Sequence, residues 1–499
     1  MKSNMRIAYK CCKYFFLLII LFLSSCTDDE IVSTGYPPEI EKILVSKCTN
    51  PGCHNTQSAG GAGGIDLSTW DNLFKGGRNG SPVIPYSSDY SYLLYFVNTY
   101  VDLGVVLEPT MPLGSNPLSR SEVTTLRNWI EQGAPGNNGT VKFSGNSQRK
   151  KVYVANQACD QVAVFDASSR MIMRYIKVGV DDNVIEAPHQ IRISPDGNYW
   201  YVLFYSSNVI QKFRTSDDTF VDSINIGSGV WNTMAISPDG SKAFVSDLSL
   251  NGKVCYLDLN TMQKIIDYTG LSWPHGTWVS ADGKTLYVTS QTGNFIYKIN
   301  ITNPAAPVTQ TVVLQTGQSQ VFVSSLDPHE IIFSPDESKY FLTCQKSDEV
   351  RVMQTSNDSL IAVFSVGTRP QEMSLSENRP YLFITCQETP SSDPKKKGSV
   401  AVIDYNSLAV VVPGEIYSGF QPHGVAVDDD QDVVYVANLN YDPNGPPPHH
   451  STDCGGRNGY LTIIDMKTMQ LLNITTTDGI SYNYKNELLA FPYSVAYRK

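Results

Sequence analysis

The sequence predicts a multidomain protein, with a small all-α region followed by a much larger all-β region. Apolar residues fall at helical spacing between residues 38 and 47 and lead into a cluster of Cys and His. Beyond residue 147, one short motif recurs at spacings of 42 to 54 residues, which indicates a repeat architecture. A length of 499 residues accommodates two or three domains. The 36 Gly and 28 Pro are ordinary usage, which excludes a collagen-like chain.

Charge narrows the choice of partners. The formal net charge is -10 at pH 7, although the first 25 residues are basic. A chain this acidic is repelled by phosphate backbones and by anionic lipid surfaces. We therefore expect no nucleic-acid partner, and a soluble partner of positive charge is favoured.

The N-terminus has the pattern of an export signal. Four basic residues precede ten apolar residues at 14–23, which is too short for a membrane-spanning helix. The sequence Leu-Ser-Ser-Cys at 23–26 then resembles the bacterial lipobox, which implies that Cys26 is lipidated after removal of residues 1–25. An ordinary signal with a chance Cys is the alternative. The lipobox implies a protein anchored to the outer membrane of a Gram-negative bacterium, facing the periplasm or the surface, with 26–37 as a tether.

The first chemical motif follows the predicted helix. Cys48, Cys53 and His54 stand in the spacing C-x4-C-H. Two thiols beside an imidazole are the groups that attach a haem covalently and bind its iron, normally in the spacing C-x-x-C-H. The motif here is two residues longer. A local disulfide between the two Cys, or a zinc site, are the alternatives, although zinc needs a fourth ligand that no nearby Cys or His supplies.

Several further motifs follow in a fixed order. They are a Gly-rich stretch at 59–64, G-G-x-x-G at 76–80, Met-Pro at 111–112, and W-I-x-x-G-A at 129–134. This order resembles a family of bacterial cytochrome c domains found in exported lipoproteins.

The resemblance implies a small all-α cytochrome c-like domain over 38–135 with one covalent haem c. It implies attachment through Cys48 and Cys53, with His54 and Met111 as the iron ligands. His/Met ligation raises the potential of a haem. Residues 136–146 are then a linker.

The repeats occupy residues 147–499. Each begins with a short apolar run after a Pro or Trp, ends in a turn such as S-P-D-G, and is followed by further short strands. Four strands per unit in this pattern resemble the YVTN-type seven-bladed β-propeller. The unit that starts at Lys151 lacks a first strand, so we expect residues 492–497 to supply it and close the ring.

One face of the ring collects the remaining His. All first strands start at the same end of the propeller, so the residues after each Pro share one rim. These positions hold His189, His275, His329 and His423, with Asn232, Gln371 and Tyr493 in the other units. The insertion 440–459, with His449, His450 and Cys454, is expected on the same rim. We interpret this rim as the functional face, for a redox partner protein, a small-molecule ligand or a second metal. Hydrogen-bonded imidazoles around a watery channel mouth are the alternative.

The other Cys suggest two links between neighbouring units. Cys159 and Cys454 fall in rim loops, and Cys344 and Cys386 occupy equivalent strand positions. Both pairs are candidate disulfides, provided that their Cα atoms come within about 7 Å. Cys255 is expected to be a buried thiol.

Two functions are open on these observations. The first is electron transfer by a membrane-anchored, extracytoplasmic c-type cytochrome, with the propeller binding the donor, substrate or partner. The second is a propeller lipoprotein for binding, adhesion or sensing, in which the haem region is accessory. The sequence carries no Ser-His-Asp order, phosphate-binding Gly loop or paired-carboxylate motif, so a propeller lactonase or dehydrogenase rests on fold analogy alone.

Overall fold

The computed structural model describes residues 33–388, 397–450, 454, 456–476 and 478–498. The predicted signal peptide and Cys26 lie outside the described residues. No described helix is both long and apolar enough to cross a bilayer. Short helices occupy the N-terminal region, which we define as residues 33–150. They are α2 (Pro38–Cys48), α3 (Trp70–Leu73), η1 (Ser88–Tyr90), α4 (Tyr92–Val97), η2 (Val101–Leu103) and α5 (Arg120–Glu131).

The prediction of a small all-α cytochrome c-like domain is wrong. The longest helices, α2 and α5, have 11 and 12 residues, and α3 and α4 have only 4 and 6. Most of the N-terminal region is turn and loop. Gly at 60, 61, 63 and 64 and Pro at 82, 85, 109 and 112 explain this, because both residue types break helices. The protein is almost all β.

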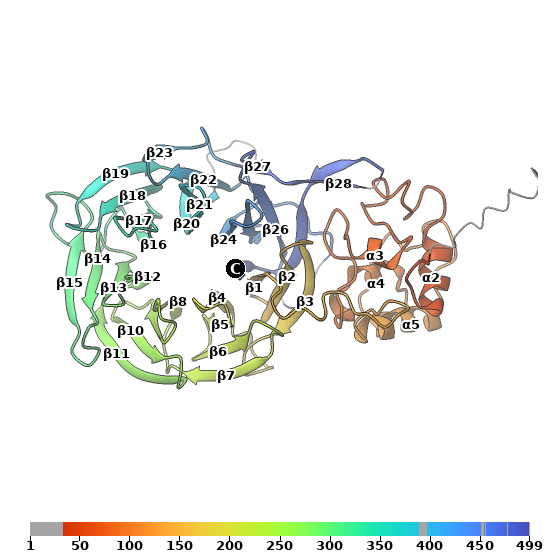
Figure 1. Ribbon diagram of the computed structural model, residues 1–499, viewed down its shortest axis with the longest axis horizontal. Helices are drawn as coiled ribbons and strands as arrows, with labels where there is room; N and C mark the ends of the chain where they lie inside the picture. The colour runs from red at the N-terminus through yellow and green to blue at the C-terminus, as the bar shows by residue number, and fades with distance from the viewer. Residues whose placement is uncertain (1–32, 389–396, 451–453, 455, 477, 499) are drawn as a thin grey trace, which may run out of the picture.

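Residues from 151 onward form a ring of seven sheets, the blades of a β-propeller (Figure 1). The prediction of seven blades is confirmed. Blades 1 to 4, numbered along the chain, each have four antiparallel strands. Their strands are β1 (Lys151–Asn156), β2 (Gln161–Asp166), β3 (Met171–Lys177); β4 (Pro188–Ile193), β5 (Tyr199–Phe204), β6 (Val209–Arg214), β7 (Phe220–Asn225); β8 (Trp231–Ile236), β9 (Lys242–Asp247), β10 (Gly252–Asp258), β11 (Gln263–Leu271); β12 (Pro274–Val279), β13 (Thr285–Ser290), β14 (Phe295–Asn300) and β15 (Val308–Val313).

Blades 5 and 6 repeat this order, and blade 7 carries additions. In blade 7 a fifth strand, β30, pairs with β26, and a separate hairpin, β28–β29, extends from the ring. The strands are β16 (Pro328–Phe333), β17 (Lys339–Cys344), β18 (Glu349–Gln354), β19 (Leu360–Ser365); β20 (Thr368–Leu375), β21 (Tyr381–Glu388), β22 (Ser399–Asp404), β23 (Ala409–Val410); β24 (Pro422–Asp428), β25 (Val433–Asn438), β26 (Asn458–Asp465), β27 (Gln470–Leu471), β28 (Asn473–Thr475), β29 (Ser481–Asn483) and β30 (Lys485–Ala490).

The C-terminal strand closes the ring, as predicted. β31 (Pro492–Arg498) pairs antiparallel with β1, with Val495 opposite Val154. It therefore becomes the inner strand of blade 1, and Figure 1 shows the C-terminus at the centre of the ring. Pairing the first and last strands of the propeller leaves no open seam.

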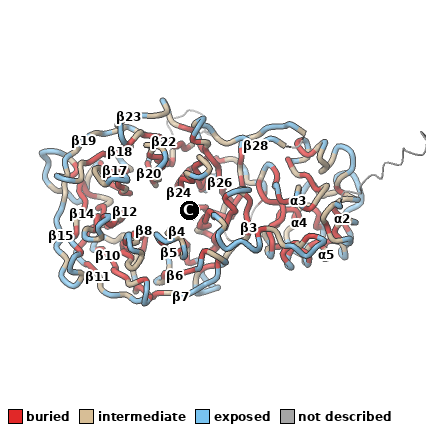
Figure 2. Tube along the Cα trace, in the orientation of Figure 1, coloured by how far each residue is buried: buried red, intermediate tan, exposed pale blue. Residues whose placement is uncertain are grey.

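Burial follows strand position within a blade. The second strands β1 and β25 are buried along their whole length, whereas the outer strand β15 is mostly exposed. Figure 2 shows buried segments within the blades and exposed segments along the outer edge of the ring. The S-P-D-G turns explain where inner strands end, because Gly197 and Gly240 have φ of 70° and 72°, the left-handed region that favours glycine.

The N-terminal region packs against blades 1 and 7. One hydrophobic cluster includes Leu44 and Trp70 from this region together with Phe165 and Met171 from blade 1. Hydrogen bonds cross the same contact, including one from Gly60 N to Asp478 Oδ2 (2.9 Å). The propeller and the N-terminal region therefore share a continuous core.

One of the two predicted disulfides forms. Cys159 in blade 1 is bonded to Cys454 in the insertion of blade 7. Cys344 and Cys386 are free, so that predicted bond is wrong. Cys344 belongs to the core between blades 4 and 5, and Cys386 to the core between blades 5 and 6, so blade 5 separates the two sulfurs. Cys255 is a buried thiol, as predicted.

Candidate functional site

The four residues predicted to hold a haem line one cavity. This N-terminal cavity has a volume of about 400 Å³. Cys48, Cys53 and His54 contribute to one part of its wall and Met111 to another, although Met111 lies far along the chain. Apolar side chains form much of the remaining wall, namely Leu44, Ile65, Leu67, Leu93, Phe96 and Val97.

The end of α2 positions the Cys and His. Ile40, Ile43 and Leu44 are buried and anchor the helix, so that Cys48 at its last position is also buried. The chain then folds back, because His54 N donates to Cys48 O (3.0 Å) and Cys53 N donates to Asn50 O (2.9 Å). The two additional residues of the motif are thus taken up in a compact turn.

Met111 and His449 approach from other elements. Met111 N donates to Phe96 O (2.7 Å), which fixes the Met-Pro loop beside α4. His449, from the insertion of the propeller, also lines the cavity and lies against Phe96, with ring centroids 4.9 Å apart. The propeller thus contributes a residue to the wall of the N-terminal cavity, which the sequence did not predict.

The ionisation of these groups follows from burial. Burial, and then the nearby Cys53, raises the pKa of the Cys48 thiol to about 11, so that Cys48 stays protonated at neutral pH. Burial lowers the pKa of His54, which keeps the imidazole neutral and able to bind a metal. His54 Nδ1 is buried and has no hydrogen-bond partner among the described residues.

Neither alternative for the C-x4-C-H motif, a local disulfide or a zinc site, is found among the described residues. Neither Cys48 nor Cys53 is bonded to any described Cys. A zinc site would need at least three ligand atoms close together, and among the described residues such a group occurs elsewhere, at His275, His329 and Glu330.

The predicted His rim is present, but it is buried. His189, His275, His329 and His423 lie within the ring of inner strands with 2 to 7% of their surfaces exposed. Their rings stack on neighbours, since His275 and His329 have centroids 4.0 Å apart and His423 and Tyr493 have centroids 3.7 Å apart. We call this set the histidine layer: His189, Asn232, His275, His329, Gln371, His423 and Tyr493.

Neighbouring blades hold the histidine layer in place. A hydroxyl on the second strand of one blade donates to the backbone carbonyl of the layer residue in the next, as Thr289 Oγ1 does to His329 O (2.9 Å). His275 Nδ1 lies 3.0 Å from the same carbonyl. His449 and His450 do not join the layer; their rings pack against Tyr92 and Tyr95 of α4.

Burial makes the layer neutral. It lowers the pKa of His189 to about 4 and that of His275 to about 3, and it moves His329 and His423 in the same direction. These side chains are therefore uncharged at neutral pH, which differs from an open, solvated rim.

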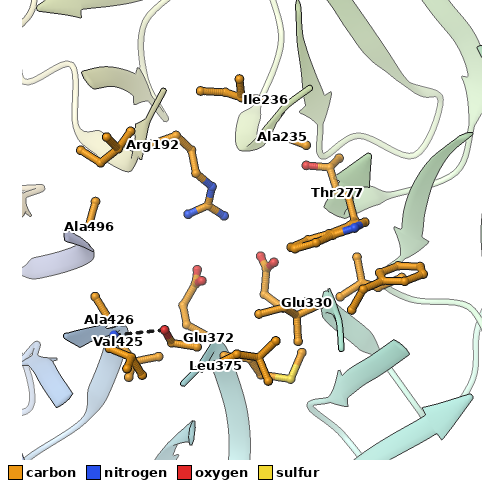
Figure 3. A pocket seen from close by; sticks show the side chains of 18 of the residues that line it. Arg192, Ala235, Ile236, Thr277, Glu330, Glu372, Leu375, Val425, Ala426 and Ala496 are labelled. Carbon is orange, nitrogen blue, oxygen red and sulfur yellow. Dashed lines mark hydrogen bonds between the residues drawn. The ribbon is translucent and has the colours of Figure 1, made fainter. Parts of the chain in front are cut away.

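A second cavity of about 730 Å³ lies inside the propeller. Residues of all seven inner strands line this channel cavity, together with turn residues such as Pro195 and Pro238. Figure 3 shows that Arg192, Glu330 and Glu372 point toward one another across it. Burial raises the pKa of both carboxyls, and Glu372 adds to the effect on Glu330.

The sequence analysis missed these three charged residues. Glu330 and Glu372 stand two positions after the Pro of their inner strands, where other blades have Gly276, Gly424 and Ser494. A charged residue at a position that is small or neutral in sister repeats was the available signal.

Comparisons with known proteins identify no family. No family model matches the sequence. The chain is 34% identical over 70 residues to Antigen Lp49 of Leptospira interrogans, a match that spans 14% of this chain and 14% of that antigen.

Two solved structures are similar in outline. Hydrazine synthase of Kuenenia stuttgartiensis has a TM-score of 0.46 at 17% identity, covering 63% of this chain and 99% of that one. A functionally unknown protein from Desulfotomaculum acetoxidans has a TM-score of 0.49 at 14% identity, covering 68% and 99%.

Proposed function

We propose that the protein is an extracytoplasmic electron-transfer protein that carries one covalent haem c in the N-terminal cavity. The observation that carries this proposal is the convergence of two thiols, an imidazole and a thioether on one mainly apolar cavity. These four groups come from two separate stretches of the chain, the C-x4-C-H motif and the Met-Pro motif. A bound haem supplies reversible one-electron transfer.

Each residue of the cavity would have its own role in holding the haem. Cys48 and Cys53 would form the two covalent links, and His54 and Met111 would be the iron ligands. The buried, unpartnered Nδ1 of His54 and its lowered pKa support this fit, because a metal needs a neutral imidazole. Apolar residues such as Leu93 and Val97 would exclude water, which tunes the potential of a buried metal.

The lipid anchor belongs to the same proposal. Cys26 would tie the protein to the outer membrane, so that the cavity and the propeller both work outside the cytoplasm. The disulfide between Cys159 and Cys454 supports an oxidising compartment, since such bonds are rare in reducing ones.

A second function, ligand binding by the propeller, is favoured by the channel cavity. Arg192 faces Glu330 and Glu372 across a space large enough for a small molecule. On this alternative, the propeller is the recognition module and the haem region is accessory to it.

Haem staining of a denaturing gel tests the first proposal. The wild-type protein from a haem-maturing host should give a peroxidase-active band, because a covalent haem survives denaturation. Cys53→Ala should weaken the band, and Cys48→Ala with Cys53→Ala should abolish it. Cys255→Ala is the matched control, since it removes a buried thiol from the propeller. An unstained wild-type band would contradict the proposal.

A further inference from the structure

Three polar groups come together beside the channel cavity, and one of them, Glu330, lines it. One potential ligand atom from each of His275, His329 and Glu330 lies within 4.8 Å of the others. All three residues are buried, with 3 to 5% of their surfaces exposed. The described part of the chain holds no other group of three or more such ligands.

These groups are poorly satisfied as they stand. His329 Nε2 and Glu330 Oε1 are buried and make no hydrogen bond to any described residue. Glu330 Oε1 lies 3.5 Å from His275 Nδ1. Burying a polar atom without a partner is costly, so such atoms usually have a ligand, an ion or water.

The surroundings hold the three residues in place while His329 Nε2 and Glu330 Oε1 stay without a hydrogen bond to any described residue. The ring of His275 stacks on that of His329, and its Nδ1 faces the carbonyl of His329 (3.0 Å), which fixes its orientation. The side-chain amide of Gln291 also lies beside His329 Nδ1, at 3.3 Å. A carbonyl that accepts the N–H of one ring nitrogen, as the His329 carbonyl can from His275 Nδ1, leaves the other nitrogen free to bind a metal.

The chemistry of the donors points to one class of ion. Two imidazoles and one carboxylate suit a divalent transition metal, and zinc in particular accepts three protein ligands and leaves a fourth position open. Glu330 also lines the channel cavity, so an open position would face a space that contains Glu372 and Arg192.

We propose that His275, His329 and Glu330 bind one divalent transition-metal ion beside the channel cavity. The site is narrower than a ring of four His, because His189 and His423 do not belong to the group. It is also independent of the haem, since no residue of the N-terminal cavity takes part.

Equilibrium dialysis of the full mature chain against zinc tests this site. The wild-type protein should bind about one zinc that depends on Glu330. Glu330→Gln should weaken this affinity at least about 100-fold, since changing a residue that only contacts a metal ligand already costs about 10–100-fold. His423→Asn is the matched control, because it changes a buried imidazole of the same layer outside the group. Cys48→Ser with Cys53→Ser removes the thiols of the other cavity, and this variant should keep the zinc.

A thermal melt with and without zinc gives a second measurement. Zinc should raise the Tm of the wild-type protein and of His423→Asn, but not that of Glu330→Gln, because an ion stabilises only the state that binds it. Glu330→Gln keeps the shape of the side chain, so it should fold. Less than about 0.2 equivalents of zinc at the group, or binding that survives Glu330→Gln, would overturn the proposal. Loss of zinc only in the Cys variant would overturn it too.

Discussion

The N-terminal cavity and the channel cavity are built in opposite ways. The N-terminal cavity combines a helix end, loops and an insertion from the propeller, and its donors are sulfur and imidazole in a mainly apolar wall. The channel cavity takes equivalent positions from seven blades, and it contains Arg192, Glu330 and Glu372. The repeat symmetry of the blades places the residues of the channel cavity. The path of the chain and its local turns place those of the N-terminal cavity.

Because of this difference, the two cavities depend on different parts of the structure. Residues of the channel lie on inner strands, so they depend on closure of the ring and on contacts between blades. Residues of the N-terminal cavity depend on the turn after α2 and on the Met-Pro loop. The predictions below test whether the two cavities respond separately, from the largest expected effect to the smallest.

Removing β31 should have the largest effect, and it should act on the channel. Deleting residues 492–499 takes away the inner strand of blade 1, including buried Val495, and leaves β1 as an open edge. Each large apolar side chain lost from a core costs about 2 kcal/mol, so we expect aggregation or a loss of at least about 4 kcal/mol. Urea unfolding and size-exclusion chromatography measure this. Val495→Ala, which keeps the strand, should cost less, and a truncated chain that unfolds like the wild type would contradict ring closure.

Acid should destabilise the channel through its buried His. The folded-state pKa of His189 is lowered to about 4, below the ordinary 6.5, so the unfolded chain binds more protons between these values. Stability from this residue is present above pH 6.5 and falls as the pH drops, by about 2 kcal/mol at pH 5. Glu330 and Glu372 have the opposite sign, since their raised pKa values cost stability as the pH rises above 4.5.

Urea unfolding of the wild type and His189→Gln at pH 7 and pH 5 isolates the effect. The carboxylates are common to both proteins, so the difference in unfolding free energy reports the imidazole. The stability of the wild type relative to the variant should fall by about 2 kcal/mol between the two pH values. An unchanged difference would show that His189 is solvated.

The sequence predicted the two parts unequally, and the reasons are physical. Repetition identified seven blades and the closing strand, because a recurring pattern constrains every unit at once. The all-α expectation failed because the order of the motifs does not show how often Gly and Pro interrupt the chain between them, and both residue types break helices. Arg192 and Glu330 were missed because they lie far apart along the chain and approach each other only when their two blades face each other across the channel. The motif did identify residues that share one cavity, because Cys48, Cys53 and His54 are adjacent along the chain.

Replacing Met111 should affect the N-terminal cavity alone. If Met111 is an iron ligand, Met111→Ala should lower the reduction potential of the haem, because a thioether favours the reduced iron. We expect a fall of at least about 60 mV, which is a tenfold change in a one-electron equilibrium. Spectroelectrochemistry measures the potential, and Met373→Ala, in a blade core, is the control. An unchanged potential and spectrum would assign the sixth position to another group.

The smallest expected effect tests whether the propeller would influence the proposed haem at all. His449 is exposed, lines the N-terminal cavity and packs against Phe96 and Tyr92. His449→Ala should admit water to the wall and lower the reduction potential by less than about 60 mV, since solvent access tunes a buried metal.

His449→Phe separates the two ways in which this residue can act. A phenyl ring restores the wall without a nitrogen atom, so the potential should return to that of the wild type if His449 only excludes water. Equal shifts in both variants would instead show that the imidazole itself acts on the haem. No shift in either would mean that the propeller leaves the haem unaffected at this contact, and the two cavities would then be separate in function as well as in construction.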